Sequence, residues 1–215
     1  MDRQRQSILD SSISVGGVPI LADYDGVMPS AIGHVDFSFT ACLRPWGRDP
    51  EQYWTEVTGR IAAIPDEAPD DAEAEPAGEI QMVLVRVAEA RNDRVSLATV
   101  FDSHSDALFE IYHALFDKSE EVEAELGLDP WAHEVLWVHT IKMEPRWKNS
   151  HLAAQAIHTA ASTLVTMGLI VADADLGLPM DDWLKLGFVR IAGQPWFYVR
   201  ERTKKNPYRR QRPCR

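Results

Sequence analysis

The stretch EPRWKNSHLAAQAI, residues 144–157, connects a strand-like segment to a helix-like segment and decides which fold the chain can adopt. Residues 135–143 before it have the pattern of a strand, and an alanine-rich helical pattern follows it. A loop between a strand and a helix N-terminus is a common phosphate site, because unpaired backbone N–H groups point outward there. Such loops usually contain glycine, but this one contains Asn149, Ser150 and His151. The loop is therefore either a phosphate site with unusual side chains or an ordinary helix start.

The composition of the chain is that of a single globular domain. Its 215 residues are 45% hydrophobic, which is enough for a substantial core. Cys42 and Cys214 lie far apart, so we expect neither a disulfide framework nor a zinc site, and no other metal. No signal-peptide core or membrane-spanning stretch is visible, which favours a cytoplasmic protein that does not contact a membrane.

Charge is distributed unevenly along the chain. The net charge is −11, but the last sixteen residues carry eight Lys or Arg and one Glu, so the remainder carries −18. An acidic body favours cationic ligands and repels nucleic acid, so we do not expect nucleic-acid binding. Residues 1–17 are expected to be a loose leader, residues 18–202 a single domain, and residues 203–215 a frayed basic tail.

The first half of the expected domain contains strands, one helix and an acidic loop. Residues 18–24 and 34–43 have strand-like patterns, and the second of these alternates polar with apolar side chains. Residues 49–52, Asp-Pro-Glu-Gln, are the residue types of a helix N-terminus. The acidic, proline-containing residues 65–79 are expected to form a mobile loop. Between these two segments, apolar residues at helical spacing predict a helix that ends at Pro65: Tyr53, Trp54, Val57, Ile61 and Ile64.

Strands and helices are expected to alternate in the second half. Residues 80–88 and 94–101 flank the turn-forming pair Asn92-Asp93 and predict a β-hairpin, whose first strand is apolar on both faces and therefore central. An amphipathic helix is expected to begin near Ala107 and to extend toward Gly127. The remaining expected elements are a strand at 134–143, a helix at 150–167 capped by Gly168, a buried strand at 169–174, a short helix at 181–188 and a hairpin formed by 188–192 and 196–200. This order predicts an α/β or α+β fold, in which helices flank a central mixed β-sheet.

Two partial motifs resemble those of the GNAT superfamily of N-acetyltransferases. In that family a strand ends in V-x-P, and R/Q-G-x-G-x-G/A then opens a long helix; here the matching residues are Met143-Glu144-Pro145 and 148–153. Residues 183–188, WLKLGF, fall on the family's later motif Y-x-K-x-G-F. The resemblance covers roughly residues 79–201. It implies a GNAT-like acyl-CoA N-acyltransferase fold, in which two parallel strands, here near 135–143 and 169–174, separate from each other.

The resemblance also implies a cofactor and a reaction. In the family, backbone N–H groups at this helix N-terminus hold the pyrophosphate of acetyl-CoA, and a strand N–H polarises the thioester carbonyl. By resemblance, the residues that bind acetyl-CoA (coenzyme A) here are Met143, Lys148, Asn149, Ser150, His151, Leu152 and Ala153. The implied activity is transfer of an acetyl group to a primary amine of a small cationic molecule or of a basic protein, and a homodimer is compatible with it.

The resemblance places a candidate base on the strand before the loop. In the family, a Glu or His four residues before the valine of V-x-P often serves as the base, and His139 occupies that position. We expect His139 to lie on the same strand face as three apolar residues, Trp137, Ile141 and Met143. The alternative is a partly buried, hydrogen-bonded sheet histidine. Glu134, at the start of the strand, is a second candidate base.

The proton donor of the family is usually the tyrosine of Y-x-K-x-G-F. Trp183 occupies that position here, and its indole N–H is not a usable acid. Another residue, such as Tyr198 or Tyr112, or water would have to replace it. The missing tyrosine and the missing glycines also suggest a second function, that of a GNAT-shaped binding module without catalysis. The two hypotheses differ in whether the N–H donors of residues 148–153 face an open cleft or are covered by His151.

Other candidate residues are given structural interpretations. The sequence Asp102-Ser103-His104 resembles a hydrolase fragment, but it is interpreted as the entry to a helix, because residues so close in a chain rarely face one another. Several tryptophans of the second half are interpreted as core residues, with an aromatic wall for the acceptor as the alternative: Trp131, Trp137, Trp147, Trp183 and Trp196.

Overall fold

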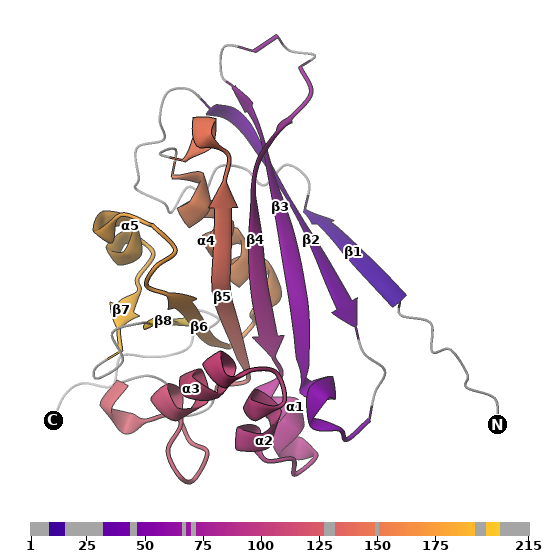
Figure 1. Ribbon diagram of the computed structural model, residues 1–215, viewed down its shortest axis with the longest axis vertical. Helices are drawn as coiled ribbons and strands as arrows, with labels where there is room; N and C mark the ends of the chain where they lie inside the picture. Colours follow the sequence, from indigo (N-terminus) through magenta and orange to yellow (C-terminus); the bar gives the residue numbers. More distant parts are fainter. Residues whose placement is uncertain are drawn as a thin grey trace, which may run out of the picture.

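A computed structural model shows one mixed β-sheet with helices packed on both of its faces (Figure 1). It describes residues 9–15, 32–43, 47–65, 68–69, 72–126, 132–148, 151–191 and 197–202. Within them the sheet has eight strands in the order β1-β2-β3-β4-β5-β6-β8-β7, and only β5 and β6 are parallel neighbours. The strands are β1 Leu9–Val15, β2 Ile32–Leu43, β3 Trp54–Pro65, β4 Glu75–Val85, β5 Glu134–Met143, β6 Gly168–Asp173, β7 Val189–Arg190 and β8 Phe197–Arg202.

The helices divide between the two faces of the sheet. One group consists of α1 Val87–Asn92, α2 Leu97–Asp102 and α3 Asp106–Leu115; the other consists of α4 Leu152–Leu164 and α5 Met180–Lys185. Residues of β5 alternate between the two groups, because Val135 and Trp137 pack with α1–α3 whereas Leu136 and Val138 pack with α4. We call these two sides the α3 face and the α4 face. The expected class, a mixed sheet flanked by helices, is confirmed, and β4 and β5 are central strands.

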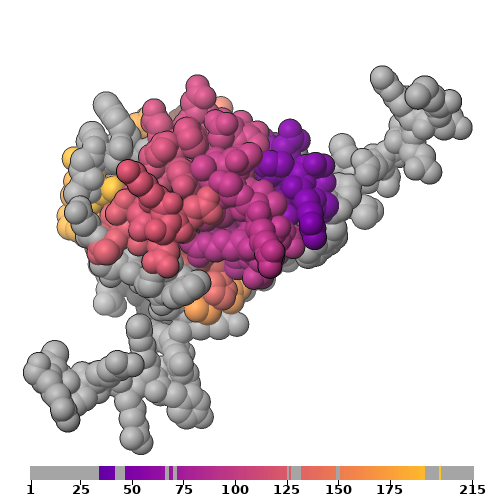
Figure 2. Space-filling view, turned by 90° about the horizontal axis from the view of Figure 1, so that it is seen from below, coloured from indigo at the N-terminus to yellow at the C-terminus, as the bar shows by residue number. Residues whose placement is uncertain are grey.

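Helices α1–α3 form a continuous surface at one end of the molecule (Figure 2). The expected helix near Ala107 is confirmed as α3, but it does not continue toward Gly127, which lies outside the described residues. It ends at Leu115, because the chain turns back there and Phe116 forms a β-bridge with Val122. Short 3₁₀ helices complete the described chain at Pro50–Tyr53, Ala124–Leu126 and Pro145–Trp147.

The helix expected between residues 50 and 65 is a strand. Only Pro50–Tyr53 are helical, and β3 follows at once and pairs with β2 and β4. Its side chains alternate between buried and exposed over most of its length. Val57 and Ile61 are four residues apart, which fits a helical spacing as well as an extended one, so their spacing alone does not decide between the two. The adjacent strands decide it, since they supply hydrogen-bond partners along the whole segment.

The hairpin expected between residues 80 and 101 is also wrong. Its first strand is confirmed as the central strand β4, but the rest of the segment forms helices α1 and α2. Asn92 and Asp93 end α1 instead of forming a hairpin turn. The buried residues of the two helices recur at helical spacing, which the short apolar runs concealed: Val87, Ala90, Leu97, Val100 and Phe101.

Several boundaries of the domain and of its helices and strands differ from those expected. The domain begins before residue 18, because residues 9–15 of the expected leader form β1 and pair with β2. The expected acidic loop is shorter than residues 65–79, since Glu75 already belongs to β4. The helix expected at 150–167 ends at Leu164, and Gly168 begins β6, where an added Cβ would lie 2.1 Å from the carbonyl oxygen of Glu134. Residues 18–24 and 203–215 lie outside the described residues.

The parallel strands β5 and β6 separate as they approach α4. Their pairing begins at Glu134 and Gly168 and ends at Val138 and Ala172. Beyond this point β5 pairs only with β4, as far as Met143, whereas β6 continues against β8. The separation is therefore located between the last residues of β5 and the loop that follows β6.

A β-bulge changes which way the end of β5 faces. The register with β4 shifts between Val138 and Thr140, so His139 is the additional residue. Ile141 and Met143 pack on the α4 face, whereas His139 contacts Trp137 on the α3 face, with 4.8 Å between the ring centroids. The expectation that these four residues share one face is therefore wrong, because the bulge inverts the alternation of side chains.

Candidate functional site

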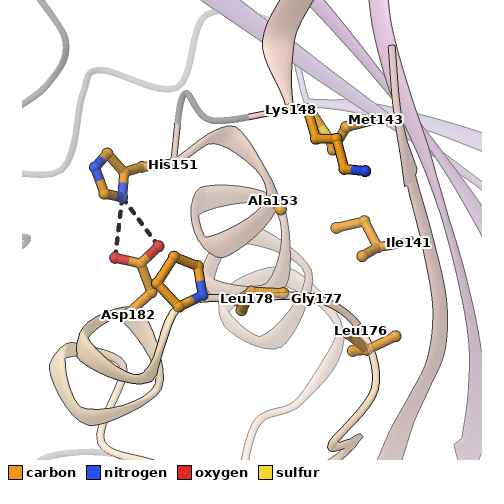
Figure 3. Close-up of a pocket in the computed structure, with 10 residues that line it drawn as sticks. Ile141, Met143, Lys148, His151, Ala153, Leu176, Gly177, Leu178 and Asp182 are labelled. Atoms are coloured by element: carbon orange, nitrogen blue, oxygen red, sulfur yellow. Dashed lines mark hydrogen bonds and ion pairs between the residues drawn. The ribbon is translucent and has the colours of Figure 1, made fainter. Parts of the chain in front are cut away.

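A cavity of about 200 Å³ lies where β5 and β6 have separated (Figure 3). Its wall comes from the end of β5, the start of α4, the loop after β6 and the first turn of α5. The structure brings four of the seven expected cofactor-binding residues to this cavity: Met143, Lys148, His151 and Ala153. Leu152 is buried in the core beneath α4. Asn149 and Ser150 lie outside the described residues.

His151 begins α4 in a left-handed conformation, with φ at 57°. Asparagine or glycine adopts this region more readily than histidine does, so the position has the geometry that a glycine would favour. The side chain does not cap α4. Instead, Nδ1 lies 2.9 Å from both carboxylate oxygens of Asp182 in α5, whose side chain is 3% exposed. In Figure 3 the ring points toward Asp182 and away from Ile141 and Met143, so it does not cross the cavity.

The cavity combines an apolar wall with charges of both signs. Ile141, Leu176 and Leu178 supply apolar surface. Lys148 supplies a cation beside the N-terminus of α4, where the helix dipole is positive. Asp182 supplies a carboxylate at the same end. Lys148 and the helix dipole favour an anion here, whereas Asp182 opposes one.

The backbone N–H group of Met143 points toward the gap that opens between β5 and β6. Met143 lies opposite Gly78 of β4, and the adjacent N–H of Glu144 donates to the carbonyl of Ala77 at 2.9 Å. Hydrogen-bonded and non-hydrogen-bonded pairs alternate along an antiparallel ladder, so Met143 and Gly78 form a non-hydrogen-bonded pair. The N–H of Met143 therefore points away from β4, toward the side that β6 has left.

A second group of polar residues lies at the same point of the sheet but on its α3 face. The ring of His139 packs on Trp137, and its Nδ1 lies 3.1 Å from the hydroxyl oxygen of Thr140. The indole N–H of Trp137 donates to Oδ1 of Asp173 at 2.7 Å. His104 also lies near Trp137, with 6.2 Å between the ring centroids. His139 and Asp173 are the first residues of their strands beyond the last parallel pair.

The surroundings shift the proton affinities of two of these groups. Burial, and secondarily the charge of His104, lowers the pKa of His139, although Glu56 opposes this shift. A lowered pKa favours the neutral imidazole that a base requires. Burial raises the pKa of Asp173 to about 6, while the Trp137 hydrogen bond lowers it and Asp175 raises it further. Asp173 therefore changes charge closer to neutral pH than an ordinary aspartate does. His139 is neutral over a wider pH range than an ordinary histidine, because its pKa is lowered.

The other expected catalytic residues do not join this group in the described structure. Glu134 lies at the opposite end of β5, roughly 30 Å from Met143 at about 3.3 Å per residue. Its carboxylate accepts from the N–H groups of Thr166 and Met167 at 3.2 and 3.1 Å, so it anchors the loop before β6. Tyr198 pairs with Ala172 through the backbone of β8, and its side chain lies outside the described part of the structure.

The remaining aromatic candidates pack in the cores. Tyr112 lies in α3 among phenylalanines, and burial raises the pKa of its hydroxyl. Trp183 is buried and packs against Phe188, 5.2 Å away between ring centroids. Trp147 is buried on the α4 face, which supports the core interpretation for it and for Trp183. Trp131 and Trp196 lie outside the described residues.

Sequence analysis did not assign three residues that the structure places here. His104 was interpreted as part of a helix entry, and it does lie between α2 and α3, but its ring projects toward β3 and β5. Glu56 was expected to lie in a helix, so the sequence did not indicate that its carboxylate would lie near His104. Asp173 ends the apolar run of β6. An acidic residue at the end of a buried strand was the one feature of the sequence that could have identified it as a site residue.

Comparisons with protein-family models, with curated proteins and with solved structures found no significant match. Among the described residues, no helix has the length and hydropathy needed to cross a membrane. The same residues contain no group of three or more His, Cys, Asp or Glu side chains arranged to hold a metal ion.

Proposed function

We propose that the protein is an acyl-CoA-dependent N-acetyltransferase with a GNAT-like fold, which acetylates a primary amine of a small cationic molecule or of a basic protein. One observation carries the proposal: β5 and β6 separate beside the N-terminus of α4, and a cavity lies at the separation. This is the arrangement that the sequence resemblance implies. Four residues of the first partial motif line this cavity, namely Met143, Lys148, His151 and Ala153. The second partial motif begins in α5, whose first turn borders the cavity.

The residues around the cavity fit a thioester with an anionic head. Lys148 and the positive end of α4 favour phosphate oxygens, and Ile141, Leu176 and Leu178 favour an aliphatic arm. The N–H of Met143 is aimed where a thioester carbonyl could accept it, and such a donor stabilises charge that develops on the oxygen. Bound acetyl-CoA would supply a thioester whose C–S bond breaks as the amide C–N bond forms.

His139 is the proposed base, acting from the α3 face at the line where the strands separate. It would take one proton from the ammonium form of the acceptor, and its lowered pKa lets the proton pass on to solvent at neutral pH. The neutral amine then attacks, and the second proton lost from nitrogen neutralises the departing thiolate. No tyrosine is among the described residues that line the cavity, and water is the proposed proton carrier in its place.

One observation favours the alternative, a binding module without catalysis. The carboxylate of Asp182 lies at the N-terminus of α4, where a pyrophosphate would bind, and like charges repel there. His151 lies against that carboxylate and offsets part of this repulsion. The two functions therefore differ in how strongly an anionic nucleotide binds.

Calorimetric titration of the full chain with acetyl-CoA tests the proposal. Binding in the micromolar range is expected, and Lys148→Glu should weaken it by about tenfold, with a larger effect at low salt. Lys142→Glu is the matched control, because Lys142 is an exposed lysine of β5 that does not line this cavity. The absence of heat up to millimolar acetyl-CoA would refute the proposal. Release of free thiol in the presence of a primary amine then separates the enzyme from the binding module.

A further inference from the structure

A second cavity lies on the α3 face of the sheet, at the end that helices α1–α3 leave uncovered (Figure 1). Its volume is about 390 Å³, and no described residue of these helices lines it. Lys142 and Glu144 line this cavity, whereas Ile141 and Met143 pack on the α4 face and line the proposed cofactor cavity. The two cavities therefore lie on opposite faces of the end of β5, and the proposed acyl transfer does not use the second one.

Three charged residues form a row across the second cavity, namely Arg60 of β3, Glu79 of β4 and Lys142 of β5. Arg60 lies directly opposite Glu79, and Glu79 lies directly opposite Lys142. Residues opposite each other in antiparallel strands have side chains on the same face, with Cβ atoms about 5 Å apart. The row therefore places a carboxylate between two cations whose backbones are about 10 Å apart.

The charges of this row line the cavity instead of neutralising one another. Among the residues that the structure describes, no ion pair is found for Arg60, Glu79 or Lys142. Arg60 and Lys142 are exposed, and Glu79 is half-buried between them. All three charged groups are therefore accessible to a ligand in the cavity.

The signs of the three charges oppose a ligand that carries only one kind of charge. Glu79 would repel an anion held between the two cations, and the two cations would repel a cation held at Glu79. A ligand with one anionic and one cationic group can instead bind two adjacent members of the row. Arg60 is the better partner for a carboxylate, because a guanidinium group donates two parallel hydrogen bonds to it. Further along the same two strands, Ala62 and Pro76 pair with each other and add apolar surface to the cavity.

We propose that this cavity binds a free α-amino acid with an aliphatic side chain, whose carboxylate lies at Arg60 and whose ammonium group lies at Glu79. Both charged groups of an α-amino acid are attached to one carbon, so they can reach residues whose Cβ atoms are about 5 Å apart. The aliphatic side chain lies against Ala62 and Pro76. This inference goes beyond the proposed function and does not rest on it.

The test is an NMR titration of the ¹⁵N-labelled full chain with L-leucine, at constant ionic strength and without acyl-CoA. The backbone amide resonances of residues 60–62 and 78–79 report on the cavity. Two analogues of leucine each carry one charge, because 4-methylpentanoate lacks the amine and isopentylamine lacks the carboxylate. Leucine should shift these resonances saturably and bind about tenfold more tightly than either analogue.

Two variants assign the two charged groups of the ligand. Arg60→Gln should weaken leucine by about tenfold and leave isopentylamine unchanged, because only the carboxylate partner is lost. Glu79→Gln should weaken leucine by about tenfold and leave 4-methylpentanoate bound at least as well as before. Arg48→Gln and Glu110→Gln are the matched controls for net charge, since both residues are exposed and neither lines this cavity.

Each outcome of these titrations upholds or refutes the site. The proposal is refuted if leucine leaves these resonances unmoved up to tens of millimolar, or if either analogue binds as tightly as leucine. It is also refuted if Arg60→Gln has no more effect than Arg48→Gln, or if Glu79→Gln has no more effect than Glu110→Gln. Leucine binding that requires both Arg60 and Glu79 upholds the site, whether or not the chain binds acetyl-CoA. Acetyl-CoA binding without leucine binding refutes this site and leaves the proposed function standing.

Discussion

The indole N–H of Trp137 donates a 2.7 Å hydrogen bond to Asp173, and this bond joins β5 to β6 at the point where their parallel pairing ends. Val138 and Ala172 form the last parallel pair, so Asp173 is the first residue of β6 beyond it. Burial raises the pKa of Asp173 to about 6. The strands are thus connected at their divergence by a carboxyl group that ionises less readily in the folded state.

Replacing Asp173 with Asn is expected to stabilise the fold at neutral pH. The pKa of Asp173 is about 6 in the folded state against an ordinary 3.8, so the folded state binds its proton more tightly. The contribution of Asp173 to the free energy of unfolding is therefore fully present below pH 3.8. It falls as the pH rises between these two values, and it is lost above pH 6. Asn has no charge to desolvate and still accepts from Trp137. Thermal unfolding should show a higher Tm for the variant at about pH 7.5 and a shrinking difference toward pH 4.

Asp175→Asn is the control for that measurement. Asp175 is exposed, and its charge contributes less to the raised pKa of Asp173 than burial does, so its replacement should raise Tm at pH 7.5 much less than Asp173→Asn does. If Asp173→Asn gave the same Tm difference at both pH values, the raised pKa would not be the source of the effect.

If the proposed acyl transfer is correct, replacing His139 with Ala should remove most of that activity. General bases contribute about 100-fold or more, so kcat/KM should fall by at least that factor. In the wild type, kcat/KM should rise with pH through a value below the ordinary 6.5 of histidine, because burial lowers the pKa of His139. The variant should lose this rise. His133→Ala, at an exposed position before β5, serves as the control. Unchanged pH profiles in the His139 variant would show that another group is the base.

The contact between His151 and Asp182 is expected to stabilise the fold. A double-mutant cycle with His151→Ala and Asp182→Asn should give a coupling free energy of about 1 to 2 kcal/mol, because the carboxylate is buried. His34 and Asp36 form a matched pair at 3.0 Å in which both side chains are about half exposed. Its coupling should stay below about 0.5 kcal/mol. Equal couplings in urea unfolding would mean that burial does not strengthen the first pair.

Two glycines should respond differently to alanine. An added Cβ at Gly168 would lie 2.1 Å from the backbone oxygen of Glu134, so Gly168→Ala must displace β5 or β6 and should cost more than about 3 kcal/mol. At Gly177 nothing lies within 4 Å, and only its φ of 75° opposes a side chain. Gly177→Ala should therefore cost only about 1 to 2 kcal/mol. Similar losses in urea unfolding would contradict the close approach of β6 to β5.

Much of the segment from residue 134 to residue 190 could be predicted because its main elements have distinct patterns. The alanine-rich face of α4 has a helical spacing, and the apolar run of β6 is too short for a helix; both elements are confirmed with shifts of a few residues. β3 could not be predicted in this way, since Trp54, Val57 and Ile61 also fit a helix. Its neighbours in the sheet decide its structure, and a single sequence does not show them.

The candidate site was predictable only where its residues are close in sequence. Met143, Lys148 and His151 belong to one loop, so a local motif could find them. Glu56 and Asp173 are more than a hundred residues apart in the sequence, and only the pairing of the strands brings both to the α3 face. The bulge at His139 adds a further obstacle, because one additional residue reverses every later side chain of β5.

Replacing His151 with Gly is expected to weaken the proposed acetyl-CoA binding, even though glycine occupies this position in the GNAT motif that the loop resembles. The left-handed φ of 57° suits glycine, so the backbone should remain in place. The imidazole that lies 2.9 Å from Asp182 would be lost, and the carboxylate would then repel phosphate at the N-terminus of α4. Calorimetry should show an affinity loss of about tenfold, and adding Asp182→Asn should restore the affinity to at least the wild-type level. If His151→Gly alone improved binding, the imidazole would be an obstruction, and the degenerate binding module would be the better account of this loop.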